Sequence, residues 1–268
     1  MVSAGVTFTP GITSPAPRGL VFALAGQSLC VVTETRVTLP VDAIAADDLY
    51  LGELDGQPCF ARLLAPEAEP PPGSTPQSMR QLFGALSDEA FGVAGRALGL
   101  TAWDRDHRFC SRCGAPTVRS PSERLRTCTA CGFGAYPRLS PAVIMLVERD
   151  GKALLARNAR TRMPFFSTLA GFVEVGETLE ETVAREVREE AGIEIRDIRY
   201  FGSQPWPFTS SMMIGFTARW ASGEITEDPI EILDAAWFGP DELPVVPPKL
   251  SIARALIDDF VARTSRPA

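Results

Sequence analysis

The sequence predicts an α+β chain with a small β-rich N-terminal domain, a short segment organised by four cysteines, and a C-terminal domain of mixed strands and helices. Three observations lead to this fold class. Short apolar stretches separated by turn residues fill residues 19–64, which is typical of strands. Two Cys-x2-Cys pairs follow. From Ala135 onward, strand-like and helix-like runs alternate. We therefore expect three domains: residues 1–100, 101–138 and 139–268.

The composition suits a chain that builds a sizeable core, because 45% of its 268 residues are hydrophobic and 22% are charged. A net charge of -7 argues against a broad surface that follows nucleic-acid phosphates. No apolar run approaches the roughly 20 residues that a membrane helix needs, so we expect no membrane segment. No basic residue precedes Arg18, so we expect no secretory signal and a cytoplasmic protein.

The N-terminal domain is expected to be a small antiparallel β domain followed by a bridging helix. Its apolar stretches are LVFALAG, LCVVT, RVTLP, DLYLGEL and PCFARLLA. Residues 1–20 are rich in Pro, Gly, Ser and Thr, and we expect them to lie loosely on the surface. The Pro-rich residues 66–76 predict a linker, and residues 78–106 show helical periodicity. No internal repeat is visible.

Four cysteines form the two pairs, with fourteen residues between the pairs: Cys110, Cys113, Cys128 and Cys131. Gly114 and Gly132 follow the pairs and suit tight turns that point backbone N–H groups at thiolates. In a cytoplasmic chain this spacing predicts a tetrahedral structural zinc site, with no open position for catalysis. Two disulfides are the alternative. His107 is the only histidine, and we expect it to pack or hydrogen-bond nearby rather than bind metal.

The cysteine segment is locally basic, which allows two interpretations. Its arginines are Arg105, Arg108, Arg112, Arg119, Arg124, Arg126 and Arg138. In an acidic protein this patch is a candidate for contact with the phosphates of a larger substrate. The alternative, at least as well supported, is a solvated surface whose arginines pair with other domains.

The C-terminal domain is organised around the stretch Gly171–Ile193, GFVEVGETLEETVAREVREEAGI. Thr178 and Glu181 predict a capping box, and Gly192 predicts the end of the helix, so we expect a helix over 179–191. Residues four apart share one helix face, which places Glu186 beside Glu190. Carboxylates this close favour a divalent cation with oxygen ligands. A solvated acidic helix face with internal ion pairs is the alternative.

The rest of the C-terminal domain reads as strands with one further helix. Asp150-Gly151 predicts a hairpin turn between the runs AVIMLVER and KALLARN. Further strands are expected in IEIRDIRYFGSQPW, SMMIGFTARWASGEI and EILDAAWF. SIARALIDDFVART predicts a closing helix.

The central stretch matches, position for position, the Nudix box G-x5-E-x7-R-E-U-x-E-E-x-G-U, in which U is aliphatic. The chain therefore resembles a Nudix hydrolase, an enzyme that cleaves a nucleoside diphosphate linked to another group. The resemblance implies an α/β/α sandwich for the C-terminal domain. A regulator or RNA binder that kept this fold without its chemistry would have damaged box glutamates, and here all four are present: Glu177, Glu186, Glu189 and Glu190.

A second motif narrows the resemblance. SQPWPFTSS, Ser203–Ser211, together with the four cysteines, is similar to the NADH pyrophosphatase (NudC-type) branch, which carries SQPWPFPxS. Thr209 departs from the family's proline, and we expect a slightly looser loop there. The resemblance implies metal-dependent hydrolysis of NADH or NAD⁺ to NMN(H) and AMP, and removal of the NAD cap from RNA. Action on ADP-ribose or diadenosine polyphosphates is the alternative.

The resemblance also assigns site residues. The Mg²⁺ or Mn²⁺ ligands would be the Ala170 carbonyl, Glu186, Glu190 and Glu231, with Glu189 as a ligand or a water-orienting group. Arg185 would hold the glutamates and Glu177 would brace the loop. Phe172 would stack on the nicotinamide side of the substrate. The other implied substrate contacts are Glu123, Tyr136, Gln204, Pro205, Trp206, Pro207, Phe208, Thr209, Ser210, Ser211 and Ala253. The family is dimeric, and Arg80 is assigned as a contact from the partner chain.

Overall fold

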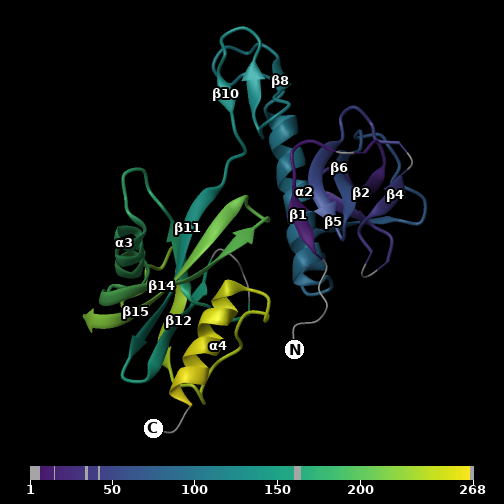
Figure 1. Cartoon of the computed structure of the whole chain (residues 1–268). Coiled ribbons are helices and arrows are strands. Elements are labelled where there is room, and N and C mark those ends of the chain that lie inside the picture. The colour runs from purple at the N-terminus through teal and green to yellow at the C-terminus, as the bar shows by residue number, and fades with distance from the viewer. Residues whose placement is uncertain (1–6, 15, 34–35, 42, 160–163, 266–268) are drawn as a thin grey trace. The chain divides into compact units, whose positions relative to one another are not determined.

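The computed structural model describes residues 7–14, 16–33, 36–41, 43–159 and 164–265 (Figure 1). The chain forms two compact units. Unit 1 comprises Met1–Arg138 with Pro207–Ser210, and unit 2 comprises Leu139–Trp206 with Ser211–Ala268. Within the part of the chain that is described, no helix is long and apolar enough to cross a membrane.

Unit 2 is built on one mixed sheet with the strand order β14-β15-β11-β12-β16, and β13 pairs with β11. The strands are β11 (Ser140–Arg149), β12 (Lys152–Asn158), β13 (Leu169–Phe172), β14 (Glu194–Trp206), β15 (Ser211–Ser222) and β16 (Ile232–Phe238). Only β11 and β15 run parallel among these pairs. Asp150 and Gly151 both have positive φ, 49° and 75°, so the predicted hairpin turn is confirmed.

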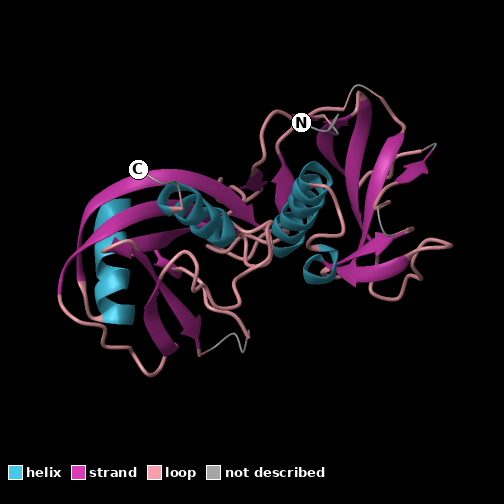
Figure 2. Cartoon of the chain, turned by 90° about the horizontal axis from the view of Figure 1, so that it is seen from below, coloured by secondary structure: helices cyan, strands magenta, loops and turns pink. Residues whose placement is uncertain are grey.

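Both faces of this sheet are covered by a helix. Along β11 alternate side chains point to opposite faces. Val143 lies in the core cluster that contains Val187, and Ile144 lies in the cluster that contains Leu256. These two partners belong to α3 (Leu179–Ala191) and α4 (Ile252–Thr264), which pack on opposite faces of the sheet (Figure 2). The expected α/β/α sandwich is therefore confirmed.

Unit 1 contains a second mixed sheet, with the order β1-β5-β6-β2-β3-β7 and β4 paired to β2. The strands are β1 (Phe8–Pro10), β2 (Gly19–Ala25), β3 (Ser28–Val31), β4 (Leu39–Val41), β5 (Leu49–Leu54), β6 (Gln57–Leu63) and β7 (Thr75–Ser78). Three predictions are wrong in detail. The domain is not purely antiparallel, because β2 and β6 run parallel. Part of the loose N-terminal stretch is a strand, since β1 pairs with β5, and Thr75 in the predicted linker begins β7.

The two sheets share one connectivity, which the sequence does not reveal as a repeat. The order β5-β6-β2-β3-β7 corresponds to β14-β15-β11-β12-β16, and β4 corresponds to β13. The single parallel pair falls at the same place in both sheets. The difference lies after the β4 or β13 strand. In unit 2 a loop and α3 separate Phe172 from Glu194, whereas in unit 1 only seven residues separate Val41 from Leu49.

Two helices connect the first sheet to the cysteine segment. They are α1 (Met79–Leu82), capped by Ser78, and α2 (Asp88–Asp106), capped by Ser87. Ala94 and Ala97 of α2 pack against one face of the sheet. The cysteine segment that follows has three short strands, β8 (Thr117–Arg119), β9 (Arg126–Cys128) and β10 (Gly134–Ala135).

Asp104 joins the end of α2 to the cysteine segment. It is only 3% exposed, and it accepts two hydrogen bonds of 2.7 Å from Arg119 and one of 2.5 Å from Arg126. Burial opposes ionisation of Asp104, but the two arginines outweigh it and lower its pKa. The carboxylate therefore stays charged and ties three segments together.

We predict that Asp104→Asn destabilises unit 1 strongly. The substitution keeps the shape of the side chain but leaves two largely buried guanidinium groups without a counter-charge, at a cost of about 3 kcal/mol in the free energy of unfolding. Urea denaturation followed by hydrogen exchange of peptides within 95–130 measures the loss. The matched control is Asp106→Asn, whose exposed pair with Arg105 is worth at most about 1 kcal/mol. Equal losses in both variants would contradict the role of Asp104.

Candidate active site

The helix α3 spans Leu179–Ala191, as predicted, because both of its ends are fixed locally. Thr178 Oγ1 accepts the Glu181 N–H at 3.2 Å, and the Glu181 carboxylate accepts the Thr178 N–H at 2.8 Å. Gly192 ends the helix in the left-handed region, at φ 70°. The resulting register buries two carboxylates on one side of the helix: Glu186 is 8% exposed and Glu190 is 3% exposed.

Arg185 holds the acidic residues of the box together. Its Nε donates to Glu177 Oε1 at 2.6 Å, and its Nη1 donates to Glu186 and to Glu189 at 2.8 Å each. Its Nη2 donates to the Phe172 carbonyl at 2.9 Å, which ties the helix to the end of β13. Hydrogen bonding from Arg185 lowers the pKa of Glu177 to about 2. Arg185 therefore offsets the repulsion among three carboxylates.

Glu177 braces the loop before the helix. Its carboxylate also accepts the Glu174 N–H at 3.1 Å and the Thr182 hydroxyl at 2.9 Å. This is the bracing position that the resemblance implied. The loop and the first turn of α3 are therefore joined through one side chain.

Glu190 is the least satisfied acid of the site. Burial, followed by the charge of Glu186, raises its pKa to about 8, with Glu231 and Asp228 adding to the effect. Its Oε2 atom is buried and has no hydrogen-bond partner. Burial also raises the pKa of Glu186. A buried carboxylate oxygen without a partner is costly, so the site fits a positive charge placed among these acids.

Gly171 brings the backbone of β13 against Glu186. A Cβ atom at this glycine would lie 1.8–2.1 Å from the Glu186 carboxyl group, so no other residue fits without displacing it. The neighbouring Ala170 has an exposed side chain in the same strand, and its backbone hydrogen bond favours the charged form of Glu190. The strand edge and the helix edge together present carbonyl and carboxylate oxygens, which hard divalent cations prefer.

Glu231 reaches the site from the turn before β16. Its charge contributes to the raised pKa of both Glu186 and Glu190. Asp228, in the same turn, donates its N–H to the Glu190 carbonyl at 3.4 Å. Sequence reasoning did not single out Asp228, although its position three residues before Glu231 was a usable signal. Among the described residues, however, no three acids bring one carboxylate oxygen each to within 4.8 Å of one another.

The motif Ser203–Ser211 divides between the two units. Gln204, near the end of β14, clamps the start of α4: its Nε2 donates to the Leu250 carbonyl at 2.7 Å, and its Oε1 accepts the Ile252 N–H at 2.9 Å. Ser211 is 2% exposed, and Ala253 on α4 is also buried. Pro205 and Trp206 complete the pairing of β14 with β15.

The remainder of that motif, Pro207–Ser210, belongs to unit 1. Phe208 packs edge-on against Phe83 at a centroid distance of 5.9 Å, and the Arg80 guanidinium lies 5.2 Å from its ring centre. Ser210 has a positive φ of 52°. Phe208 is therefore engaged in the apolar core of unit 1. Thr209 lies in the same turn.

Predicted substrate contacts with exposed side chains include Phe172, Arg80, Glu123 and Tyr136. Phe172 in unit 2 has a ring that is 56% exposed. Tyr136 in unit 1 is 57% exposed, and its hydroxyl donates to Glu123 at 2.8 Å. Arg80, Glu123 and Tyr136 lie in unit 1, whereas the acids of the box lie in unit 2.

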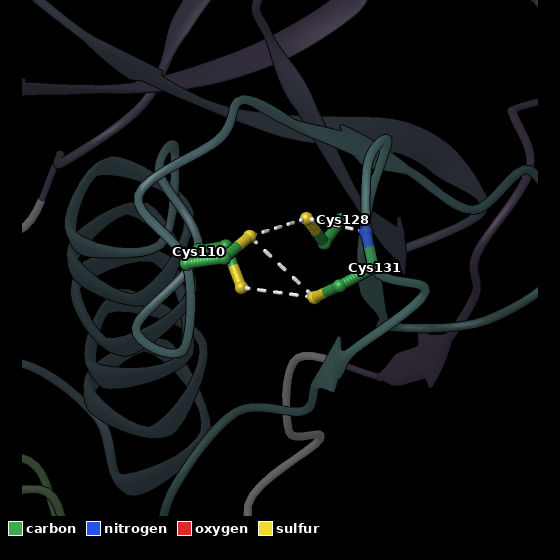
Figure 3. Close-up of side chains that lie close together, drawn as sticks. Cys110, Cys128 and Cys131 are labelled. Carbon is green, nitrogen blue, oxygen red and sulfur yellow. Dashed lines mark hydrogen bonds between the residues drawn. The ribbon is translucent and has the colours of Figure 1, made fainter.

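The four cysteines of the segment form a compact cluster (Figure 3). Sulfur–sulfur distances are 3.5 Å for Cys113–Cys128 and Cys113–Cys131, and 3.7 Å for Cys110–Cys131. All four cysteines are free, and these distances exceed the length of a disulfide, so the disulfide alternative is wrong. Zn–S bonds of about 2.3 Å in a tetrahedron place sulfurs about 3.8 Å apart. The cluster therefore has the size of a zinc site.

The turns at the two Cys-x2-Cys pairs favour the thiolate form that binds metal. Gly114 and Gly132 take positive φ, 76° and 72°, at the predicted turns. The N–H groups of Cys131 and Ala130 each donate to Cys128 Sγ at 3.4 Å, and this lowers the pKa of Cys128 to about 6. His107 instead contacts the Trp103 carbonyl through Nδ1 at 2.8 Å, as expected for a group that does not bind the metal.

Several arginines of the basic segment form hydrogen bonds within unit 1. Arg119 and Arg126 bind Asp104, and Arg124 donates to the carbonyls of Gly11 and Tyr50. The phosphate-contact interpretation is therefore wrong for Arg119 and Arg126, because both guanidinium groups are bound to the buried Asp104 carboxylate. The sequence did not reveal these contacts, because the residues that bind the arginines lie far from them in the chain.

Comparison with known proteins covers most of the chain. Residues 137–260 match the family model of the NUDIX domain. Residues 105–132 match that of the NADH pyrophosphatase zinc ribbon domain, and residues 18–103 match that of the NADH pyrophosphatase-like rudimentary NUDIX domain. The last match agrees with the connectivity that the two sheets share.

Curated relatives extend the match over both units. The chain is 45% identical over 218 residues to the NAD-capped RNA hydrolase NudC of Deinococcus radiodurans, which covers 80% of this chain and 77% of that protein. It is 46% identical over 213 residues to the NAD-capped RNA hydrolase NudC of Stutzerimonas stutzeri, with the same coverage. A solved NUDIX hydrolase from Nitrosomonas europaea is 27% identical, covers 59% of this chain and 90% of that chain, and gives a TM-score of 0.48.

The site and these matches lead to one family. The box helix, its buried acids and the cysteine cluster all fall inside the matched regions. The cysteine segment is a zinc ribbon, and its four sulfurs form a structural zinc site. The chain belongs to the NADH pyrophosphatase branch of the Nudix hydrolase family.

Proposed function

We propose that the chain hydrolyses the pyrophosphate of NADH and NAD⁺, giving NMN(H) and AMP, and removes the NAD cap from RNA 5′ ends. The observation that carries the proposal is the buried acid pair of α3, in which Glu190 keeps a carboxylate oxygen without a partner and Glu186 lies against Gly171. The relatives named as NAD-capped RNA hydrolases support the choice of substrate.

The same acids would hold Mg²⁺ or Mn²⁺. The proposed ligands are the Ala170 carbonyl, Glu186, Glu190 and Glu231, with Glu189 as a further ligand or as the group that orients water. When bound, such an ion supplies neutralising charge at the pyrophosphate oxygens and lowers the pKa of a bound water. Arg185 keeps the acids in register, since its Nη1 donates to both Glu186 and Glu189.

The substrate contacts are proposed for each unit separately. Phe172, with its exposed ring, would stack on the nicotinamide side, and Trp206 is the second candidate for stacking. Phe208 would act by packing, since its ring contacts Phe83. Arg80, Glu123 and Tyr136 would contribute to a pocket that a homodimer completes. The dimer, a cytoplasmic location and the domain boundaries at residues 100 and 138 stay predictions.

The activity is tested by a side-by-side hydrolysis panel of NADH, NAD⁺, ADP-ribose and NAD-capped RNA, with products identified by mass spectrometry. We expect NMN(H) and AMP from the dinucleotides and a 5′-monophosphate RNA from the capped RNA. ADP-ribose hydrolysed at a higher kcat/KM than the dinucleotides would favour the alternative, a pyrophosphatase for ADP-ribose or diadenosine polyphosphates.

We predict that Glu190→Gln abolishes turnover without unfolding the protein. Loss of one cation ligand removes several kcal/mol of charge stabilisation, so kcat/KM should fall by at least about 100-fold. The pKa of Glu190 is raised to about 8, so glutamine resembles the protonated acid present at neutral pH. The melting temperature without Mg²⁺ or Mn²⁺ should therefore be unchanged or higher.

Binding of Mn²⁺ gives a readout that does not depend on turnover. Electron paramagnetic resonance should show weaker Mn²⁺ binding in Glu190→Gln than in the wild type. Glu180→Gln, an exposed acid on the same helix, is the matched control and should change neither property. Wild-type turnover and Mn²⁺ affinity in Glu190→Gln would refute the metal assignment.

We predict that Cys113→Ser loses the zinc and destabilises the ribbon, because a serine hydroxyl does not replace a thiolate ligand and the short segment depends on the metal for its fold. Zinc per chain, measured by mass spectrometry of the purified protein, should fall from one towards zero. Cys30→Ser is the control, since Cys30 is buried in the sheet of unit 1. It should lower stability but retain zinc. Full zinc content in Cys113→Ser would contradict the assignment.

A further inference from the structure

Two arginines inside unit 1 carry charge without a counter-ion. Arg124, in the zinc ribbon, donates through Nη2 to the carbonyls of Gly11 and Tyr50. Arg96, on α2, lies 5.7 Å from the ring centre of Phe8. The Nε atoms of both arginines are buried and have no hydrogen-bond partner. Each guanidinium is therefore partly buried and forms no ion pair with a described residue.

The protein groups near these arginines do not supply the missing negative charge. In the described ranges, no carboxylate forms an ion pair with either guanidinium, whereas Arg119 and Arg126 share Asp104. Cys59 lies near Arg96, but burial raises the pKa of its thiol to about 12 and keeps it neutral. Burial likewise raises the pKa of Tyr50. Neither positive charge is therefore offset by an ion pair within the described residues.

The missing counter-ion affects the pKa of Arg124. Burial, followed by repulsion from Arg96 and Arg119, lowers its pKa to about 10. Two neutral carbonyl acceptors do not require a charged donor, and an isolated buried cation is costly. An anion would remove that cost, because a guanidinium fork binds phosphate oxygens through charge-assisted hydrogen bonds.

A cavity of about 310 Å³ opens beside Arg124. Tyr50, Trp103 and Ser120 also line it, so it offers aromatic edges and a hydroxyl next to the guanidinium. Two acids line it as well, Asp48 and Glu123, and both have partners. Asp48 is bound by Arg62 at 2.6 and 2.8 Å, and Glu123 accepts the Tyr136 hydroxyl. The volume lies at the lower end of the range for small-molecule sites.

We propose that this cavity binds a phosphate dianion on Arg124, either free phosphate or the 5′-phosphate of a mononucleotide. Arg124 supplies the charge and the donors that are not spent on carbonyls, Arg96 adds to the local positive field, and Ser120 offers a further hydrogen bond. The proposal concerns unit 1 alone and does not depend on the activity assigned to unit 2. Binding would stabilise unit 1, because a ligand that binds only the folded state raises its stability.

The test is calorimetric titration of the full-length, zinc-loaded protein with inorganic phosphate and with AMP, at constant ionic strength and without Mg²⁺ or Mn²⁺. Wild-type protein should bind phosphate, and its melting temperature should rise with phosphate but not with an equal ionic strength of chloride. Arg124→Met should weaken binding by about tenfold or more. Arg105→Met, at an exposed arginine paired with Asp106, is the matched control and should bind as the wild type does.

A second variant separates binding from folding. Arg96→Met leaves the bonds of Arg124 to its two carbonyls in place, and it should still weaken phosphate binding by several-fold through loss of positive charge. AMP that binds at least about tenfold more tightly than phosphate would identify a nucleotide as the ligand, and equal affinity would identify free phosphate. Absence of phosphate binding in the wild type, or equal binding in Arg124→Met and Arg105→Met, would overturn the proposal.

Discussion

The geometry of the active site depends on the close approach of Gly171 to the Glu186 carboxyl group. At Gly171 the end of β13 comes so close to Glu186 that a single added carbon would overlap the carboxyl group. This approach sets the helix edge against the strand edge. Arg185 then secures it from the other side, since its guanidinium binds acids from the loop and the helix and the carbonyl of Phe172. Without that cation, carboxylates at this spacing would push the loop and the helix apart.

The shared connectivity of the two sheets explains why only one unit carries the acids. Both sheets have the parallel pair at the same place and bury one face against a long helix. Only unit 2 has the loop and helix between its β13 and β14 strands. Unit 1 has a sheet of the same connectivity, and its buried side chains pack α2 against that sheet. A fold of this type therefore supports chemistry only where the loop and helix are inserted.

The sequence predicted those features whose causes are local. The bounds of α3 follow from Thr178, Glu181 and Gly192, and the hairpin follows from Asp150-Gly151, because caps and turns depend on a few neighbouring residues. The cysteine cluster was equally accessible, since its spacing is the signal. The parallel pairing of β2 with β6 was not, because it depends on a crossover between strands with similar patterns. The residue roles assigned from family resemblance stay predictions.

The arginines of the cysteine segment also depend on contacts that are distant in the sequence and that the sequence analysis did not predict. Seven arginines in a short segment suggested a surface for phosphates, but Arg119 and Arg126 turn inward to Asp104. Their partner precedes them by more than a dozen residues, and nothing in the local pattern distinguishes a buried arginine from an exposed one. Asp228 was missed for a different reason. Its hydrogen bond to Glu190 is made by the backbone N–H, so the type of side chain at this position does not reveal it.

The hydrogen bonds of Gln204 bear on which residues can alter substrate specificity. Both ends of this amide are occupied by the backbone around residues 250 and 252, so its hydrogen-bonding capacity is committed to seating α4. The proposed stacking role of Phe172 would then leave discrimination between flat groups to side chains with exposed faces. A different ring or an aliphatic group at that position would alter which leaving group is held, while the closing helix remains anchored.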